Sequence, residues 1–279
     1  MSAVLDFPIK PEARPYLDAF GRRGARDPDW LTRERRRALS RFAELGFPTR
    51  RSEGWRYLDL QPLQQKPLLP AEPEAGKHDA IAQAQLAGLE LPGRGLRLVI
   101  LDGRFAPELS NIRDLPAGLW FGATHRAMVE REDLFREVAE EASGDAAHPF
   151  AALNAAFFAD GYILDIGPGL ALQEPIEIVH LATGAPAASL HTRSLVSLGE
   201  GACATVLEAY AGEGHYWRND VVAVRLGSGA ELSGAVLIEE STEAVHLAEL
   251  NATLGADAHF TGFALLLGGG TVRQEASVQ

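Results

Sequence analysis

The sequence predicts a protein that is mainly β with α: an N-terminal, mostly helical domain over residues 1–160, then a right-handed parallel β-helix over residues 161–279. Two observations predict this class. The helical period of apolar residues ends near residue 160, and a glycine turn then recurs between strand-like runs about every 28 residues. A period of roughly 20 to 50 residues made only of strands and glycine turns is typical of a β-solenoid.

The N-terminal part begins with an amphipathic helix over Asp29–Gly46, with Asp29 as the expected N-cap and Gly46 as the expected C-cap. Its apolar stripe consists of Leu31, Ala38, Phe42 and Leu45. Its other faces carry Arg33, Arg35, Arg36, Arg37 and Arg41. These arginines fit either a membrane or nucleic-acid patch or a solvated helix face. Glu34 and Glu44 interrupt the positive charge, which favours the solvated face.

Further elements precede the solenoid. Residues 61–92 are rich in Pro, Gln and Ala, which predicts a loop with a short helix around Asp79–Ala87. Leu96–Leu101 is an apolar run ending in Asp102-Gly103, the signal of a strand and a tight turn. Arg126–Ala142 and Pro149–Ala159 return to helical patterns.

The solenoid is predicted from four turns of similar sequence. They are Ile166–Leu170, Leu198–Ala202, Leu226–Ala230 and Leu254–Ala258. The first glycines of the last three lie at positions 199, 227 and 255, so these turns are 28 residues apart. A β-sandwich does not require the same turn at equal spacing, and hexapeptide-repeat coils come in multiples of six. We expect Gly268-Gly269-Gly270 to form a tight corner of the solenoid.

Alternation along the strands assigns two faces, because successive side chains in a strand point to opposite sides. After the third turn, the predicted interior face is Ala230, Leu232, Gly234, Val236 and Ile238, and the predicted exterior is Glu231, Ser233, Ala235 and Glu239. After the fourth turn, the interior continues as Ala258, Phe260, Gly262, Ala264 and Leu266.

Composition narrows the class of protein. Of 279 residues, 46% are hydrophobic, and the single cysteine, Cys203, excludes an internal disulfide framework. The net charge is -12; residues 1–60 carry 13 Lys/Arg and 9 Asp/Glu, and the other 219 carry 13 and 29. Such an acidic body would repel nucleic acid. With no apolar stretch long enough for a signal peptide or a membrane span, we expect a cytoplasmic protein without a membrane partner.

Few residues of the sequence suggest catalysis or metal binding. The sequence has no phosphate-binding loop, H-E-x-x-H, C-x-x-C or G-x-S-x-G motif. Cys203, Glu231 and His259 each lie four residues after the repeated glycine, on the exterior face. If each repeat is one coil, they form a line of potential metal ligands. The alternative is three unrelated surface residues, with Cys203 a small packed thiol, because a straight line rarely supplies converging ligands.

The remaining candidates are weaker. His180, His191, His215 and His246 are scattered, which favours surface or hydrogen-bonded core histidines over ligands. The acidic run Glu239–Glu243 could mimic the carboxylates of secreted β-helix polysaccharide enzymes. A solvated corner loop is the alternative, favoured by the missing signal peptide.

Three stretches resemble the SufB/SufD family of iron–sulfur cluster assembly proteins. Pro48–Tyr57 matches the Pro-Thr-Arg-x-x-Glu-x-Trp-Arg/Lys-Tyr signature near the N-terminus of its SufD-type members, although Leu58 stands where the family usually has Thr. Leu153–Gly161 with Pro175–His180 resembles the segment that leads into the family's β-helix. The third stretch runs from Arg193 through the glycine turns to Arg273.

The resemblance implies a non-enzymatic scaffold subunit of a SufBCD-type complex, which pairs with a SufB-like paralogue through the β-helix. It implies an iron–sulfur cluster at the level of the complex and no cofactor of this chain. The family's C-terminal coils, its cluster-ligating histidine and the helical domain that binds the SufC-like ATPase lie beyond Gln279 in the family pattern. We therefore expect a truncated form. The alternatives are a β-helix carbohydrate-active enzyme and a free-standing metal-binding solenoid.

Overall fold

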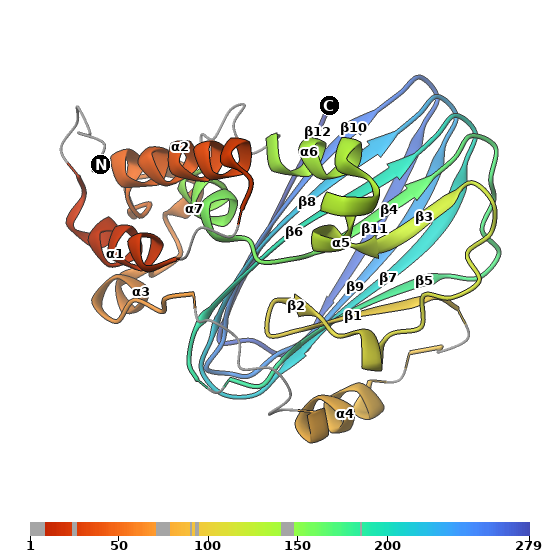
Figure 1. Ribbon diagram of the computed structural model, residues 1–279. Coiled ribbons are helices and arrows are strands. Elements are labelled where there is room, and N and C mark those ends of the chain that lie inside the picture. The colour runs from red at the N-terminus through yellow and green to blue at the C-terminus, as the bar shows by residue number, and fades with distance from the viewer. Residues whose placement is uncertain are drawn as a thin grey trace.

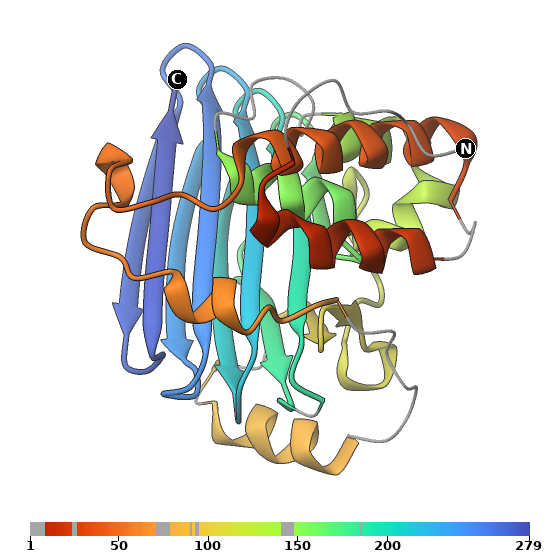
Figure 2. The ribbon, with the colours of Figure 1, turned by 90° about the vertical axis from the view of Figure 1, so that its left-hand side faces the viewer.

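The computed structural model describes residues 9–23, 27–70, 79–89, 91–92, 95–140, 148–184 and 186–279. Strands wind into a solenoid, and helices lie across one of its faces (Figures 1 and 2). The α-helices are α1 (Arg14–Arg22), α2 (Asp29–Leu45), α3 (Gln61–Gln65), α4 (Asp79–Gly88), α5 (Thr124–Glu130), α6 (Glu132–Glu140) and α7 (Pro149–Phe157). Short 3-10 helices span Pro11–Ala13, Glu53–Trp55 and Pro107–Leu109.

The strands are β1 (Arg97–Leu101), β2 (Arg104–Phe105), β3 (Leu119–Ala123), β4 (Tyr162–Ile166), β5 (Ile176–Ala182), β6 (Ser189–Leu198), β7 (Cys203–Gly212), β8 (Trp217–Leu226), β9 (Glu231–Glu239), β10 (Val245–Leu254), β11 (His259–Leu266) and β12 (Thr271–Val278). They form two sheets. The helix-side sheet has the order β12-β10-β8-β6-β4-β3, and the opposite sheet has the order β11-β9-β7-β5-β1-β2.

Successive strands from β4 onward alternate between the two sheets, so each coil contributes one strand to each sheet. The pairing from β4 to β12 is parallel within each sheet. Trp217 pairs with Ser189 and with Val245, each 28 residues away. The predicted parallel β-helix and its 28-residue coil are therefore confirmed.

Strands from the first 160 residues extend both sheets. β1 pairs in parallel with β5, and β3 pairs antiparallel with β4. The predicted strand and turn at Leu96–Gly103 are confirmed, because Asp102 and Gly103 both have positive φ, at 48° and 79°, as a two-residue type I′ hairpin requires. β2 and β3 were not predicted.

The repeated turn depends on two positions. Its fourth residue is left-handed in every repeat: φ is 68° at Gly169, 64° at Gly201 and Gly229, and 57° at Asp257. Aspartate is one of the few other residues that tolerate this conformation. The first glycine is required by stacking, since a Cβ at Gly227 would lie 2.7 Å from the Glu200 nitrogen of the coil before it.

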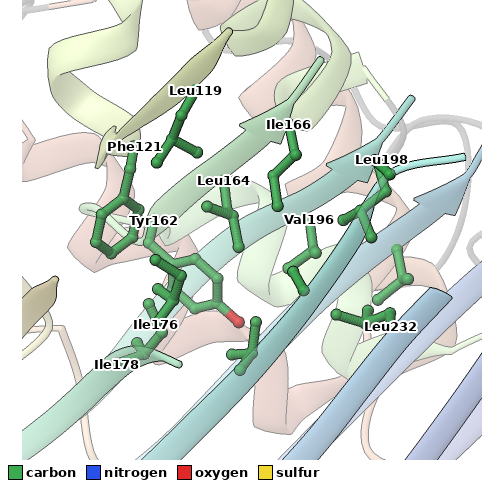
Figure 3. Packing of buried hydrophobic residues seen from close by; sticks show 14 of the residues in the cluster. Leu119, Phe121, Tyr162, Leu164, Ile166, Ile176, Ile178, Val196, Leu198 and Leu232 are labelled. Atoms are coloured by element: carbon green, nitrogen blue, oxygen red, sulfur yellow. The ribbon is translucent and has the colours of Figure 1, made fainter. Parts of the chain in front are cut away.

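After the fourth turn, the predicted interior residues Gly262, Ala264 and Leu266 are exposed, because β11 has a neighbouring strand on one side only. After the third turn, the interior has the predicted alternation. Ala230, Leu232 and Ile238 are buried, whereas Glu231, Ser233 and Glu239 are exposed. Aliphatic residues from both sheets pack between them into one cluster, which includes Leu164, Ile178, Val196 and Leu232 (Figure 3). Burying each such side chain contributes about 1.5–3 kcal/mol. Gly268–Gly270 forms the corner between β11 and β12, as predicted.

Helices α1, α2, α6 and α7 cover the outer face of the helix-side sheet (Figure 2). α1, α2 and α7 share a cluster with Trp217 and Leu247 of β8 and β10, and α6 packs on Ile163, Leu195 and Ala223. Helix α4 covers part of the opposite sheet, since Ala82 packs with residues of β1, β5 and β7.

Three details of the helical predictions were wrong. Arg35 is 4% exposed and packs on the Phe158 ring, so it does not belong to the solvated face of α2. The N-cap of α2 is Pro28, and Asp29 is the first helical residue, whereas Gly46 is the C-cap as predicted. The helix predicted over Arg126–Ala142 is divided into α5 and α6 at Arg131, and residues 141–142 lie outside the described residues.

None of the helices in the described ranges has both the length and the apolar character needed to cross a lipid bilayer.

Candidate functional site

The line predicted on the exterior face exists. Cys203 pairs with Glu231, and Glu231 pairs with His259, so the three residues occupy one register at the start of β7, β9 and β11. Adjacent strands lie about 4.7–4.9 Å apart. Within the described residues, no three His, Cys, Asp or Glu side chains are gathered as a metal ion requires. A metal site at this line therefore stays a prediction.

Metal analysis of protein purified without oxygen tests that site. If the line binds iron or zinc, the wild-type chain will carry metal, and the Cys203→Ala/His259→Ala variant will lose most of it. The buried His191 is a matched control, because its ring already bonds Ser189 and Asn219, so His191→Gln should leave the metal content unchanged. Equal metal content in wild type and double variant would rule the site out.

Three of the scattered histidines are hydrogen-bonded core residues, as the sequence favoured. His180 bonds Glu208, His191 bonds Ser189 and His246 bonds Glu240. Burial lowers the pKa of His191 to about 3, so this imidazole is neutral at physiological pH. His180 and His246 also belong to one group of polar side chains inside the solenoid, which their sequence positions alone did not indicate.

We call this group the interior polar layer. It consists of Tyr162, His180, Thr192, Glu208, Tyr210, Arg218, Asp220, Glu240 and His246, which come from β4, β5, β6, β7, β8, the corner after β9, and β10. Their strand positions alternate with outward-facing residues, so the coils place them between the two sheets. The layer thus replaces aliphatic packing at one end of the strands.

Glu208 is the centre of one half of the layer. Its carboxylate lies 2.9 Å from His180 Nε2 and accepts hydrogen bonds from Tyr210 (2.8 Å) and Tyr162 (3.4 Å). The His180 ring stacks on Tyr210, with centroids 4.4 Å apart. Burial and the nearby Glu208 carboxylate raise the pKa of Tyr162 and Tyr210 well above the ordinary value, so both phenols stay protonated donors.

Glu240 is the centre of the other half. Arg218 Nε donates to it at 2.7 Å and His246 Nδ1 lies 2.8 Å away, and all three side chains are fully buried. Burial alone would raise the pKa of Glu240, but the charge of Arg218 and the hydrogen bond from His246 outweigh it and lower the pKa to about 2. The Arg218 guanidinium also lies 5.2 Å from the Tyr210 ring, which joins the two halves.

Several polar atoms of the layer have no hydrogen-bond partner among the described residues. They are His180 Nδ1, His246 Nε2, Arg218 Nη1 and Nη2, and Asp220 Oδ2. Buried polar groups are normally bonded, and each of these could meet an ordered water. A histidine backed by a carboxylate is also a common arrangement in metal sites. Here, however, no third donor among the described residues completes such a site.

Beside the layer lies a cavity of about 300 Å³ between the two sheets. Glu208, Tyr210 and Tyr162 line its polar side, and Val206, Leu250 and Phe260 are among its apolar walls. The size and the mostly apolar lining are typical of a pocket for a small ligand. The layer holds the polar side in place, because its members bond across successive coils.

Comparisons with known proteins agree with this architecture. A model described as the SufBD protein N-terminal region matches residues 24–178. A second, described as the SUF system FeS cluster assembly SufBD core domain, matches residues 180–279.

Two curated proteins are similar to the chain. An iron–sulfur cluster assembly SufBD family protein of Synechocystis sp. is 27% identical over 231 residues, which are 78% of this chain and 49% of that protein. The iron–sulfur cluster assembly protein SufD of Escherichia coli is 24% identical over 248 residues, which are 86% of this chain and 54% of that protein. The chain spans about half the length of these relatives.

Proposed function

The chain belongs to the SufBD family of iron–sulfur cluster assembly proteins, and on that premise we propose that it is a non-catalytic scaffold subunit that pairs with a SufB-like paralogue through its β-helix. The complex is of the SufBCD type, with a SufC-like ATPase as a further partner. The iron–sulfur cluster is the product of that complex. It is not a resident cofactor of this chain.

The observation that carries the pairing is an exposed apolar area on the opposite sheet, which we call the outer patch. Leu207, Ala235 and Phe263 form one register line across β7, β9 and β11, with Leu265 beside it. Phe263 is 63% exposed and Leu265 is 43% exposed. Since these side chains point outward, further coils stacked on β11 would leave them uncovered. Large aromatic and aliphatic groups in one exposed area are typical of protein interaction surfaces.

The buried carboxylates support a role without catalysis. Glu208 and Glu240 are each bound by two or three neighbouring side chains, and Arg218 neutralises Glu240. The hydrogen bonds of these carboxylates link neighbouring coils and stabilise the solenoid. The polysaccharide-enzyme alternative needs carboxylates that share one groove, and here Glu240 is buried while Glu239 and Glu243 are exposed.

Co-expression with the SufB-like and SufC-like proteins of the same organism tests the proposal. We expect the chain to purify in a complex whose light-scattering mass exceeds that of the chain alone. Replacing Phe263 and Leu265 together by Ser should weaken the pairing at least about ten-fold, because buried aromatic anchors dominate interface energies.

Val129→Ser is the matched control. Val129 is an 82% exposed apolar residue of α5, outside the outer patch, so this variant should pair like the wild type. A wild-type chain that never joins a SufB-like protein contradicts the scaffold proposal. A double variant that pairs normally contradicts the placement of the interface at the outer patch.

A further inference from the structure

The helical part holds a second site of a different kind. Two adjoining hollows, of about 170 and 110 Å³, lie where α1, α2, β2 and the carboxyl end of α7 meet. Both are lined by Arg23, Arg104 and Ala159. We call this place the arginine cleft; among the described residues, the arginines that line it are Arg22, Arg23, Arg35 and Arg104.

The cleft carries more positive than negative charge. Among the described lining residues, the one carboxylate is that of Asp27, which lies 3.4 Å from Arg23 and 3.0 Å from Arg35 and is therefore shared by two guanidinium groups. Burial lowers the pKa of Arg35 to about 9, and the charge of Arg23 acts in the same direction. A further carboxylate, that of Asp160, accepts hydrogen bonds from the backbone N–H groups of Phe105 and His125.

Two of the arginines have a structural role. Arg23 Nη1 donates to the Ala156 carbonyl at 3.0 Å, and Arg35 Nη1 donates to the Phe158 carbonyl at 2.9 Å. These carbonyls end α7, where cations are favourable. Stabilising α7 therefore accounts for Arg23 and Arg35, but it does not account for the other two arginines.

Arg104 has no such role. Its side chain forms no ion pair or hydrogen bond with any part of the chain that the structure describes, and it lines both hollows. Its backbone is nevertheless fixed, because Arg104 pairs with Leu101 in the β1–β2 hairpin and the next residue, Phe105, donates to the buried Asp160. The fold thus holds an exposed guanidinium group, unpaired among the described residues, at the junction of the two hollows.

We propose that the arginine cleft binds a phosphate-type oxyanion, which Arg104 and Arg22 hold together with the charge of Arg23. Guanidinium groups match the geometry of phosphate oxygens and bind them through two parallel hydrogen bonds. Each hollow exceeds the roughly 30 Å³ of one liquid water. Phe157 and Phe158 line the two hollows, and Arg22 and Arg104 are exposed, so an anion from solvent can reach both guanidinium groups. Free phosphate and a phosphate monoester of a larger compound share this chemistry.

Calorimetric titration of the intact chain tests the site, with inorganic phosphate in one arm and glycerol 3-phosphate in the other, against sodium chloride of equal ionic strength. We expect saturable binding at one site for at least one of the two. Tighter binding of inorganic phosphate points to the free ion as ligand, and tighter binding of the ester points to a larger phosphorylated compound. Arg104→Gln should weaken the binding about ten-fold or more, since it removes charged hydrogen bonds.

Arg126→Gln serves as the matched control, because Arg126 is an exposed arginine of α5 that pairs with Glu130. It should bind phosphate like the wild type. Thermal melting without phosphate shows whether Arg104→Gln remains folded, as its unpartnered side chain predicts. The proposal is overturned if the wild type shows no saturable binding in either arm. It is also overturned if Arg104→Gln and Arg126→Gln bind equally well.

Discussion

Replacing Glu240 by Gln is expected to cost about 3–5 kcal/mol in the free energy of unfolding at pH 7. Glu240 and Arg218 are both fully buried, and Arg218 Nε donates to the carboxylate at 2.7 Å. Removing one member of a buried ion pair leaves the other charged and desolvated. Urea denaturation measures the loss. Glu231→Gln, at an exposed position of β9, should change stability by less than about 0.5 kcal/mol.

The same carboxylate makes stability depend on acid. The pKa of Glu240 is about 2 in the folded chain, against 4.5 when unperturbed. A carboxylate whose pKa is lower in the folded chain stabilises the fold fully when the pH is above its pKa in the unfolded chain. This stabilisation is lost as the pH falls from about 4.5 to about 2. The contribution is about 3 kcal/mol. Denaturation curves of Glu240→Gln should lack this part of the acid dependence. A variant within about 1 kcal/mol of wild type at pH 7, with an unchanged acid slope, would contradict the assigned role.

Much of the solenoid could be predicted from the sequence, because its geometry repeats. The coil length follows from the glycines at positions 199, 227 and 255, and alternation after each turn separates Leu232 from Glu231. Both signals are local. β3 was missed because its strand character comes from pairing with the distant β4. β2 was missed because a strand of two residues is too short to show a period.

The buried arginine and the interior polar layer were missed for a different reason. Hydrophobicity patterns treat Arg35 and Arg218 as surface residues, whereas tertiary contacts with Phe158 and Glu240 hold them inside. A signal for the layer was present at the coil spacing itself. Thr192 and Asp220 are 28 residues apart and form a 2.6 Å hydrogen bond, and His180 and Glu208 have the same separation. Complementary polar residues one coil apart would have predicted contacts across the coils.

Replacing Trp217 by Ala is expected to cost about 3–5 kcal/mol, the usual range for removing a buried aromatic side chain. Trp217 begins β8, is fully buried and lies within 5.3–6.3 Å of the rings of Phe150, Phe47 and Tyr16. These partners belong to the helical part, so Trp217 joins that part to the solenoid. Because the loss falls on this junction, the amide protons of α1 and α2 should exchange faster, while those of β7 and β9 keep their protection.

Trp217→Phe separates packing from hydrogen bonding at this junction. The indole Nε1 is buried and has no partner among the described residues, so losing its N–H removes an unsatisfied donor. Phe also retains most of the ring contacts. We therefore expect Trp217→Phe to cost less than half as much as Trp217→Ala in urea denaturation. If Trp217→Ala instead speeds exchange equally in α2, β7 and β9, the helices and the coils unfold as one unit. That result would contradict a local effect of Trp217 on the junction. Uniform acceleration would also mean that the solenoid depends on its helical cover for stability.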